Sequence, residues 1–334
     1  MKKISIVSGC YNEAGNIEEL YNEIKKYTNK LINYDWEIVF ADNCSTDGTI
    51  EILRSIAAKD KNVKVILNQA NYGADRSGAN ALFNVCADAV IVMASDLEDP
   101  PELIPRFVKA WEDGYQVVMG QYTSRQENPV LNLCRWFYYH VIALFSEYKL
   151  EQNVTGFGLY DMDVINQIRQ LGEYCIILRF LCTELGYTIK YIPFEKPQRK
   201  AGKSSYSIIK YYKYAVETLV LTSHAPLQMA SFVGFIMAAI SVLIAFYFLI
   251  QKLLHWYVFE FGLAPIMIGI FFIGGLQLFF IGIIGEYLSS AIKRVTKRPY
   301  VIEKERINFE GYGRPGKPDS SNNETNSAYK RGYL

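Results

Sequence analysis

The sequence contains little that could build a zinc site or a disulfide framework. Its 334 residues include only three histidines, which stand far apart in the chain. The six cysteines form no Cys-x-x-Cys pair, and they are Cys10, Cys44, Cys86, Cys134, Cys175 and Cys182. Zinc sites and small disulfide-bonded domains need such residues at short, regular spacings. We therefore interpret these residues as reduced, buried thiols of a cytosolic domain.

The chain also lacks a strong net charge. Lys and Arg total 35 against 34 Asp and Glu, which gives a formal net charge of +1. Because a basic field is the usual electrostatic footprint of nucleic-acid binding, we expect no nucleic-acid partner. Function must therefore be sought in local clusters of side chains.

Motifs for two common classes of nucleotide ligand are missing as well. No Gly-x-Gly-x-x-Gly follows the first apolar run, and no P-loop lysine is present. These motifs bind the phosphates of dinucleotides and of nucleoside triphosphates. Their absence favours a nucleotide sugar over both classes.

What is present is an alternation of two hydrophobic periods. Short runs rich in β-branched residues alternate with helical patterns, and the first run is too short for a signal peptide. This alternation predicts an α/β fold whose parallel sheet is covered on both faces. The predicted strands are 4–8, 37–41, 63–67, 90–94, 117–120, 155–160 and 188–193. The predicted helices are 14–33, 46–59, 74–86, 101–113, 128–148, 161–170 and 173–185.

Polar clusters follow three of the predicted strands. They are Tyr11-Asn12-Glu13, the stretch 42–47 and the stretch 96–99. Ligands of parallel sheets bind beyond the carboxyl ends of the strands, so we expect the clusters to gather along one edge. There Asp42 could accept hydrogen bonds from a uracil ring or a ribose. Tyr11, Asn12, Glu13, Asp42 and Asp96 are the predicted donor-binding residues.

An apolar run ends abruptly in three acids, Asp96, Glu98 and Asp99. Carboxylates this close repel one another unless a cation or hydrogen-bond donors hold them. If the segment is extended, Asp96 and Glu98 point to the same side. We expect these two to bind Mg²⁺ or Mn²⁺ together with a diphosphate. Asp99 either caps the following helix or belongs to the site.

Two long segments, 229–250 and 261–285, contain no charged residue. Each exceeds the roughly 20 residues that a membrane-spanning helix needs, so we predict a transmembrane hairpin. Basic residues flank the hairpin on both sides, which predicts that both termini are cytoplasmic. The stretch 201–225 has one apolar face and is expected to lie as an amphipathic helix on the membrane surface. The flanking basic residues are Arg199, Lys200, Lys203, Lys210, Lys213, Lys293, Arg294, Lys297 and Arg298.

Several stretches together resemble the family 2 glycosyltransferases of the GT-A fold, specifically the polyprenyl-phosphate glycosyltransferases. This group includes dolichol-phosphate mannose synthase and the bactoprenol glucosyltransferases. The similarity covers approximately residues 3–303. It is carried, in order, by SIVSGCYNEAGNI (5–17), ADNCSTDGT (41–49), NYGADRSGANAL (71–82), SDLEDPPELI (95–104), RKAGKSSYS (199–207) and GEYL…KRPY (285–300).

The resemblance implies a membrane-bound hexosyltransferase of the bacterial inner membrane. Such an enzyme moves a sugar from a nucleotide donor to a polyprenyl phosphate with inversion, uses Mg²⁺ or Mn²⁺ and forms homo-oligomers. We favour UDP over GDP as the carrier, and the sugar is left open. Arginines suit bidentate contact with a lipid phosphate, so Arg125, Arg135 and Arg199 are the predicted acceptor-phosphate residues. Asp96, Arg199 and Lys203 are the predicted catalytic residues.

This chain departs from the family pattern at four places. The family often has Asp-Ala-Asp where Ala94-Ser95-Asp96 stands, and Gln where Glu98 stands. One carboxylate is thus lost and one gained, which supports Glu98 as a metal ligand. The family often has Asp-Asp where Asp42-Asn43 stands. Its usual Gly-Asp-Phe-Arg is replaced here by Thr155-Gly156-Phe157-Gly158. Two alternatives stay open: transfer to another lipid such as diacylglycerol, or a catalytically silent lipid-binding or scaffold relative.

The expected organisation has five parts. A GT-A nucleotide-sugar-binding, Rossmann-like sheet forms the cytoplasmic catalytic domain, and an amphipathic interfacial segment and two transmembrane helices follow it. A cytoplasmic basic segment and a disordered tail then complete the chain. The expected boundaries are 1–200, 201–225, 226–290, 291–310 and 311–334.

Overall fold

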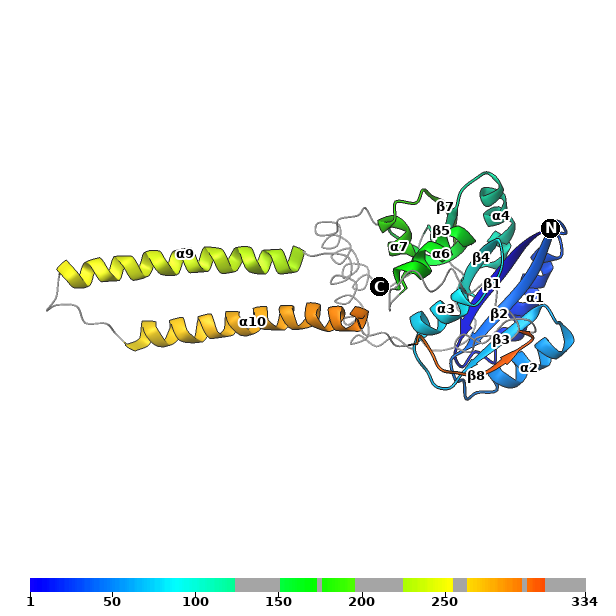
Figure 1. Cartoon of the computed structure of the whole chain (residues 1–334), viewed down its shortest axis with the longest axis horizontal. Helices are drawn as coiled ribbons and strands as arrows, with labels where there is room; N and C mark the ends of the chain where they lie inside the picture. Colours follow the sequence, from blue (N-terminus) through cyan, green and yellow to red (C-terminus); the bar gives the residue numbers. More distant parts are fainter. Residues whose placement is uncertain (124–150, 173–175, 196–224, 255–262, 296–298, 310–334) are drawn as a thin grey trace, which may run out of the picture.

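The structure is a computed structural model, and it describes residues 1–123, 151–172, 176–195, 225–254, 263–295 and 299–309 (Figure 1). The strands are β1 (Lys2–Cys10), β2 (Tyr34–Asp42), β3 (Val63–Asn68), β4 (Ala89–Ala94), β5 (Val117–Tyr122), β6 (Val154–Asp161), β7 (Ile189–Phe194) and β8 (Glu303–Ile307). The helices are α1 (Ile17–Thr28), α2 (Thr49–Lys59), α3 (Ala74–Phe83), η1 (Pro101–Leu103), α4 (Ile104–Glu112), α6 (Met162–Leu171), α7 (Leu178–Glu184), α9 (Ala225–Leu254) and α10 (Leu263–Val295). The predicted helix at 128–148 and most of the predicted interfacial segment lie outside the described residues.

The strands form one mixed sheet in the order β7-β5-β6-β4-β1-β2-β3-β8. The pairs β4–β1, β1–β2, β2–β3 and β5–β7 are parallel, whereas β6 runs antiparallel to both β4 and β5, and β8 runs antiparallel to β3. The prediction of a parallel sheet was therefore wrong for β6, and β8, the other antiparallel strand, was not predicted as a strand. Strand order and direction depend on long-range pairing, which local periodicity does not encode.

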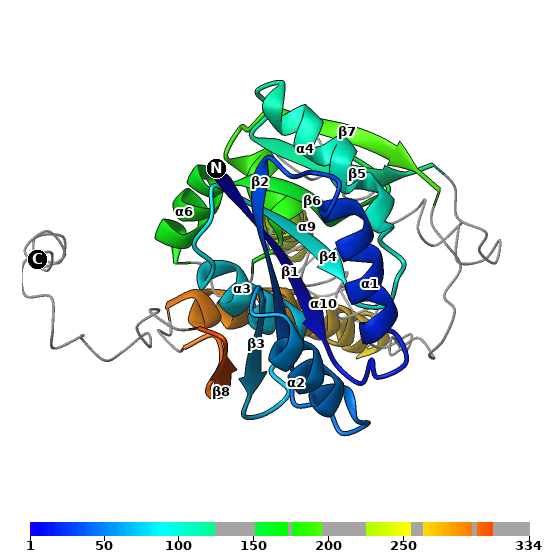
Figure 2. The ribbon, with the colours of Figure 1, turned by 90° about the vertical axis from the view of Figure 1, so that its right-hand side faces the viewer.

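Helices cover both faces of the sheet (Figure 2). α1, α2 and α4 contribute to the core on one face, where Ile4 and Ile6 of β1 are buried. α3, α6 and α7 contribute to the core on the other face, which contains Val7 of the same strand. Because both faces are buried, the central strands are apolar over most of their length. The predicted layered α/β architecture is confirmed.

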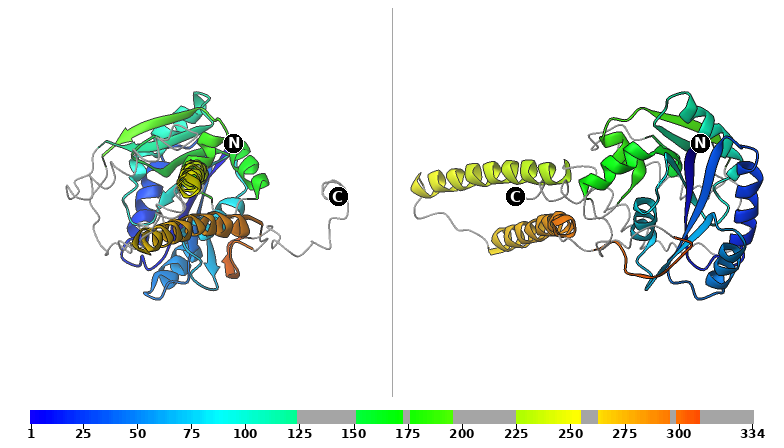
Figure 3. Two further views of the ribbon diagram at one scale, coloured as in Figure 1. Left: turned by 90° about the vertical axis from the view of Figure 1, so that its left-hand side faces the viewer. Right: turned by 45° about the vertical axis from the view of Figure 1, so that its right-hand side comes forward.

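Two long apolar helices project from the sheet domain. α9 and α10 contact each other, and they extend away from the sheet in Figure 1 and in the right-hand view of Figure 3. Within the described residues, Phe272–Ile292 of α10 is the single stretch long and apolar enough to cross a membrane. α9 carries a shorter apolar stretch, Leu227–Ser241. The structure thus contains both predicted apolar helices, and in the part of the chain that it describes only α10 has the length and composition of a membrane span, so the predicted pair of transmembrane helices is not confirmed.

Beyond α10, the chain returns to the sheet over residues 299–309. β8 lies beside β3 at the sheet edge, where Figure 2 shows it in orange. No strand is predicted here, because Glu303-Lys304-Glu305-Arg306 is a run of charged residues without a period of two. Charged side chains are common on edge strands, where they discourage pairing with other chains. The missed strand ties the chain that follows α10 to the edge of the sheet.

Candidate active site

Three loops meet at one edge of the sheet. They follow β1, β2 and β4 and comprise residues 11–16, 43–48 and 95–99. In the strand register Cys10 pairs with Asp42 and Gly9 pairs with Ala94, so the three strands end at the same level. The prediction that the polar clusters share one edge is confirmed. We call this edge the rim.

The first two loops of the rim are joined by hydrogen bonds. The amide of Asn12 donates to the Ser45 hydroxyl at 2.9 Å, and the amide of Thr46 donates to Asn12 Oδ1 at 2.9 Å. Tyr11 is 44 % exposed beside them. Asn12, a predicted donor-binding residue, therefore has a structural task in pinning the loops together.

Asp47 and Thr49 fasten the same pair of loops from the helix side. Asp47 Oδ2 accepts from the Ala14 amide at 3.1 Å, and Oδ1 accepts from the Thr49 hydroxyl at 2.6 Å. The amide of Glu13 donates to the Thr49 hydroxyl at 2.9 Å. Burial raises the pKa of Asp47, but the hydrogen bonds from Thr49 and Ala14 outweigh it and lower the pKa below its usual value. Asp47 therefore remains an anion that holds both loops.

Asp42 is fully buried at the end of β2. Its Oδ2 accepts from the Ser45 amide at 3.0 Å, and its Oδ1 lies 4.0 Å from the Cys10 sulfur. Burial, and then the carboxylates of Asp42 and Glu13, raise the pKa of Cys10 well above its usual value. The Cys10 thiol thus stays protonated and is no nucleophile. Asp42 shapes the second loop.

The acidic loop after β4 is a turn and not an extended segment. Asp96 Oδ1 accepts from the Glu98 amide at 3.2 Å, and Leu97 between them has a φ of 60°. The prediction that Asp96 and Glu98 alternate along an extended chain was therefore wrong, because this turn reverses the backbone locally. Both side chains remain partly exposed at the rim.

Asp99 is buried below this turn and braces it. Its Oδ2 accepts from the Ala94 amide at 2.8 Å, while the Ser95 hydroxyl donates to the Gly9 carbonyl at 3.0 Å. The following helix η1 has Pro100 at its N-cap and no side-chain cap. Asp99 therefore does not cap the helix; it fixes the end of β4.

Each rim loop contains one residue other than glycine in the left-handed region. These residues are Asn12, Cys44 and Leu97, with φ values of 57°, 64° and 60°. Asn tolerates this conformation, whereas Cys and Leu pay roughly 1–2 kcal/mol for it. The surrounding hydrogen bonds hold these strained turns. At each turn the chain changes direction abruptly just after the strand ends.

The acids of the rim fit a hard divalent cation. Asp96 and Glu98 offer carboxylate oxygens, and no group of three or more His, Cys, Asp or Glu suited to a metal occurs in the part of the chain that the structure describes. Mg²⁺ typically takes one or two protein carboxylates and completes its shell with phosphate oxygens and water. Asp96 and Glu98 would supply the protein carboxylates of such a shell.

A network of asparagines at the ends of β2 and β3 was missed by sequence reasoning. Asn43 Nδ2 donates to Asn71 Oδ1 at 2.9 Å, and Asn43 Oδ1 accepts from the Tyr72 amide at 2.9 Å. Asn68 Nδ2 donates to the Ser77 hydroxyl at 2.8 Å. Single asparagines carry no chemical signature in a sequence, although 71–82 was one of the stretches that carried the family resemblance. The network extends the rim to the start of α3.

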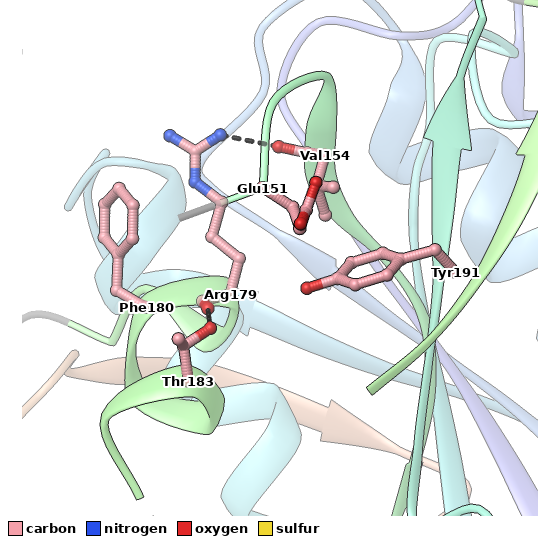
Figure 4. A pocket seen from close by; sticks show the side chains of 6 residues that line it. All are labelled: Glu151, Val154, Arg179, Phe180, Thr183 and Tyr191. Atoms are coloured by element: carbon pink, nitrogen blue, oxygen red, sulfur yellow. Dashed lines mark hydrogen bonds between the residues drawn. The ribbon is translucent and has the colours of Figure 1, made fainter. Parts of the chain in front are cut away.

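A small pocket opens near the start of β6, on the side of the sheet that α7 covers (Figure 4). Arg179 on α7 donates to the Val154 carbonyl at 2.6 Å, and its guanidinium lies 4.6 Å from the ring centre of Phe180. Glu151, Thr183 and Tyr191 complete the lining. No residue of this pocket was predicted as a site residue.

Four predicted site residues cannot be placed. Arg125, Arg135, Arg199 and Lys203 lie outside the described residues. Their assignment to the acceptor phosphate and to catalysis stays a prediction. The described part of the candidate site lies at the ends of β1, β2, β3 and β4.

Comparison with known proteins identifies the family. Residues 5–169 match the model of Glycosyl transferase family 2. An uncharacterized glycosyltransferase, sll0501 of Synechocystis sp., is 31% identical over 301 residues, which cover 90% of this chain and 94% of that protein. The SfII prophage-derived bactoprenol glucosyl transferase of Shigella flexneri is 30% identical over 305 residues, which cover 90% of this chain and 98% of that protein.

Among solved structures, a glucosyl-3-phosphoglycerate synthase from Mycobacterium tuberculosis in complex with Mn²⁺ and UDP aligns with a TM-score of 0.48 at 18% identity, over 66% of this chain and 76% of that one. A similarity at this level establishes neither a substrate nor a metal. The sequence relatives, each matched almost from end to end, carry the assignment. The chain belongs to glycosyltransferase family 2 and is a glycosyltransferase.

Proposed function

We propose that the chain transfers a hexose, with inversion, from a UDP-sugar to a polyprenyl phosphate at the cytoplasmic face of the bacterial inner membrane. The observation that carries this proposal is the alignment with the Shigella bactoprenol glucosyl transferase, which spans 90% of this chain and 98% of that protein. An alignment of that length includes the apolar helices as well as the sheet. A lipid acceptor explains why a sugar-transferring sheet is joined to helices whose large apolar side chains are exposed.

The donor is proposed to lie along the rim. Asp96 and Glu98 would hold Mg²⁺ or Mn²⁺ together with the diphosphate, and Tyr11 and Glu13 would line the nucleoside side. Asp42 and Asn12 support this surface from below, given the loop hydrogen bonds that they make. A divalent ion bound there supplies positive charge for the departing diphosphate.

The acceptor needs no general base. A phosphate monoester has a second pKa near 6, so a lipid phosphate is mostly a dianion at pH 7 and already a nucleophile. One of its oxygens attacks the anomeric carbon while the bond from that carbon to the diphosphate breaks, which inverts the configuration. The protein's task is to position the two substrates and to balance their charge. Asp96, Arg199 and Lys203 are the residues proposed for this task.

Arg125, Arg135 and Arg199 are proposed to bind the acceptor phosphate. Guanidinium groups form paired, charge-assisted hydrogen bonds with phosphate oxygens, which fixes the orientation of the nucleophile. A charge-neutral acceptor such as diacylglycerol would give these arginines no comparable partner. The arginines therefore favour a lipid phosphate as the acceptor.

The membrane arrangement is proposed from the helices and their flanks. α9 and α10 form a hairpin with both domain-facing ends in the cytoplasm, within the proposed segment 226–290. Residues 201–225 lie on the membrane surface, and 1–200 form the catalytic domain. Assembly into homo-oligomers is proposed on the resemblance alone.

A transfer assay tests this function. The full chain in nanodiscs is given undecaprenyl phosphate and, in turn, radiolabelled UDP-glucose, UDP-galactose, UDP-N-acetylglucosamine and GDP-mannose. We expect label in an acid-labile lipid with one UDP-sugar, dependent on undecaprenyl phosphate and abolished by EDTA. Label in added diacylglycerol instead would move the function to the other acceptor. Absence of both lipid label and nucleotide release would identify a catalytically silent protein.

A further inference from the structure

The stretch 299–309, here called the return segment, docks on the edge of the sheet. β8 pairs with β3 through Val65 with Ile307 and Leu67 with Glu305, and the Gln69 amide donates to the Ile302 carbonyl at 2.8 Å. Gln69 belongs to the chain that leads from β3 to α3. The return segment therefore touches the approach to the rim as well as the strand.

Side chains of the return segment also bind α3. Asn80 Nδ2 donates to Glu303 Oε1 at 2.7 Å, and Arg306 donates to Asn84 Oδ1 at 2.9 Å. The rings of Phe83 and Tyr300 meet edge to face at 5.6 Å. The segment is thus fixed at several points along the helix that begins at the rim.

Further contacts bury the end of the segment. Asn308 Nδ2 donates to the carbonyls of Ala57 and Val63 at 2.7 and 2.8 Å. Val301 and Phe309 are 7% and 9% exposed. A tail that merely followed a membrane helix would not be integrated into the core in this way.

Arg76 is where the return segment meets the rim. It lies in the first turn of α3, and its Nη2 donates to the Pro299 carbonyl at 3.0 Å. Its guanidinium lies 5.0 Å from the ring centre of Tyr72. The Tyr72 amide in turn donates to Asn43 Oδ1 in the rim network, and the Asn43 amide donates to the Cys10 carbonyl. A short path of contacts thus joins Pro299 to the ends of β2 and β1.

The membrane helices are close to this path in the chain. α10 ends at Val295, and the return segment begins at 299. Figures 1 and 3 show that end of α10 near α3 and β8. The bond from Arg76 to the Pro299 carbonyl is thus the first described contact with the sheet domain that follows α10 along the chain.

We propose that Arg76 is a positioning residue that couples the end of α10 to the rim and so sets where the sugar donor sits relative to the membrane surface. This inference rests on the proposed function, because a height above the bilayer matters only if the acceptor is a lipid. A misplacement of about 1 Å can cost about 100-fold in rate, so a rigid coupling has catalytic value. The proposed coupling also explains why the chain returns to the sheet as strand β8 after α10.

The test separates coupling from folding. Arg76→Met removes the donor to Pro299 while keeping an unbranched stem over Tyr72. Arg54→Met is the matched control, because Arg54 on α2 also pairs with the return segment, through Glu305, but contacts no rim residue that the structure records. A third variant inserts two glycines between Arg298 and Pro299, which loosens the link to α10 and changes no residue that contacts the sheet.

Transfer is measured on the full chain with two acceptors. One is undecaprenyl phosphate in nanodiscs, and the other is a short, water-soluble polyprenyl phosphate with the same protein in detergent. We expect Arg76→Met and the glycine insertion to lower kcat on the nanodisc substrate about tenfold or more, with the soluble acceptor and the Kd for UDP within twofold of wild type. Arg54→Met should match wild type throughout. Equal losses on both acceptors, unchanged nanodisc turnover, or an equal loss in Arg54→Met would overturn the proposal.

Hydrogen exchange gives a readout that needs no turnover. If the coupling exists, the Tyr72 amide should exchange about tenfold faster in the glycine insertion than in wild type, while Arg54→Met leaves it unchanged. Unchanged exchange in the insertion variant would contradict the coupling. A wild-type chain without transfer activity would instead refute the proposed function, and the exchange result would still decide whether the link to α10 is coupled to the rim.

Discussion

Neighbouring acids of one turn perform different tasks in this chain. Asp96 and Glu98 stay partly exposed at the rim, whereas Asp99 is buried and holds the Ala94 amide. The position of the acids at the end of β4 was predictable, because an apolar run leads directly into them. Which of the acids are exposed and which is buried was not predictable. It depends on the left-handed turn at Leu97, which no local sequence pattern indicates.

The first prediction concerns the two rim acids. Asp96→Asn and Glu98→Gln should each raise the Mn²⁺ concentration for half-maximal transfer about tenfold or more, because a carboxylate ligand is lost. Asp99→Asn is the control, since an amide oxygen still accepts from the Ala94 amide. A metal titration of the three variants checks this. Unaltered metal dependence in both rim variants would exclude these acids as ligands.

A second residue-scale prediction concerns a buried cluster at the opposite ends of the strands. Glu37 is 3% exposed, and it accepts from Ser5 and from Lys3 and Lys64 at 2.5 and 2.9 Å. Burial raises the pKa of Glu37, but Lys3, Ser5 and Lys64 lower it more, so the net shift is downward. A carboxyl with a lowered pKa stabilises the fold above its unfolded pKa of about 4.3, and this contribution is lost as pH falls through the folded pKa.

When the pH is lowered below about 4.3, the melting temperature of the wild type should therefore decrease, in part because Glu37 becomes protonated. Glu37→Gln should be less stable at pH 7 by about 3–5 kcal/mol, because Lys64 is left buried without its carboxylate. Its stability should then decline less between pH 5 and 3 than that of wild type. Thermal unfolding in detergent across that range checks both parts. A parallel acid decline in the two proteins would show that Glu37 is not the titrating group.

At the scale of elements, the sequence predicts whether a segment is a strand or a helix better than it predicts which strands pair with each other. Seven of the strands lie where hydrophobic runs indicate them, although their ends shift by a few residues. The insertion of β6 between β4 and β5 was not predictable from periodicity, because pairing is a long-range choice. β8 was missed because its charged residues resemble a solvated segment.

The pairing of β6 with β5 requires a residue without a side chain at position 158. A Cβ at this position would lie 2.1 Å from the Val118 carbonyl oxygen and 2.9 Å from the Met119 Cα. Both obstacles are backbone atoms that cannot rotate away. Gly158→Ala should therefore destabilise the chain by about 1–3 kcal/mol or more.

Gly78→Ala is the matched control for this prediction. Gly78 lies inside α3, and a Cβ there meets nothing within 4 Å. Because Ala is the better helix former, this variant should be neutral or more stable by up to about 1 kcal/mol. Melting temperatures of both variants in detergent check the pair. Equal stability of Gly158→Ala and wild type would show that the two strands pair differently.

At the scale of the whole molecule, the sheet domain and the helices form one connected unit. The chain leaves the sheet domain, forms α9 and α10, and returns to the sheet as β8. The two long apolar segments predicted from charge-free runs are both helical, and α10 has the length and composition to span a membrane. The route back to the sheet was not predicted, and the proposed coupling between α10 and the rim depends on it.

The proposed topology predicts which parts face outward. Trp256 lies in the connector between the two apolar segments, and Ser327 lies near the C-terminus. In intact cells, a membrane-impermeant maleimide should label Trp256→Cys well above the wild-type background, and should label Ser327→Cys only after the cells are permeabilised. Labelling of both positions from outside would rule out a hairpin with cytoplasmic termini.

The central claim is that the rim holds a metal-bound nucleoside diphosphate beside the membrane. The most direct test is a structure of the full chain in nanodiscs with Mn²⁺ and UDP. We predict Mn²⁺ within about 2.5 Å of carboxylate oxygens of Asp96 and Glu98, with the diphosphate on its other side and the uridine over the ends of β1 and β2. UDP bound elsewhere, for instance in the pocket beside Arg179, or bound at the rim with both acids turned away from the metal, would contradict the account.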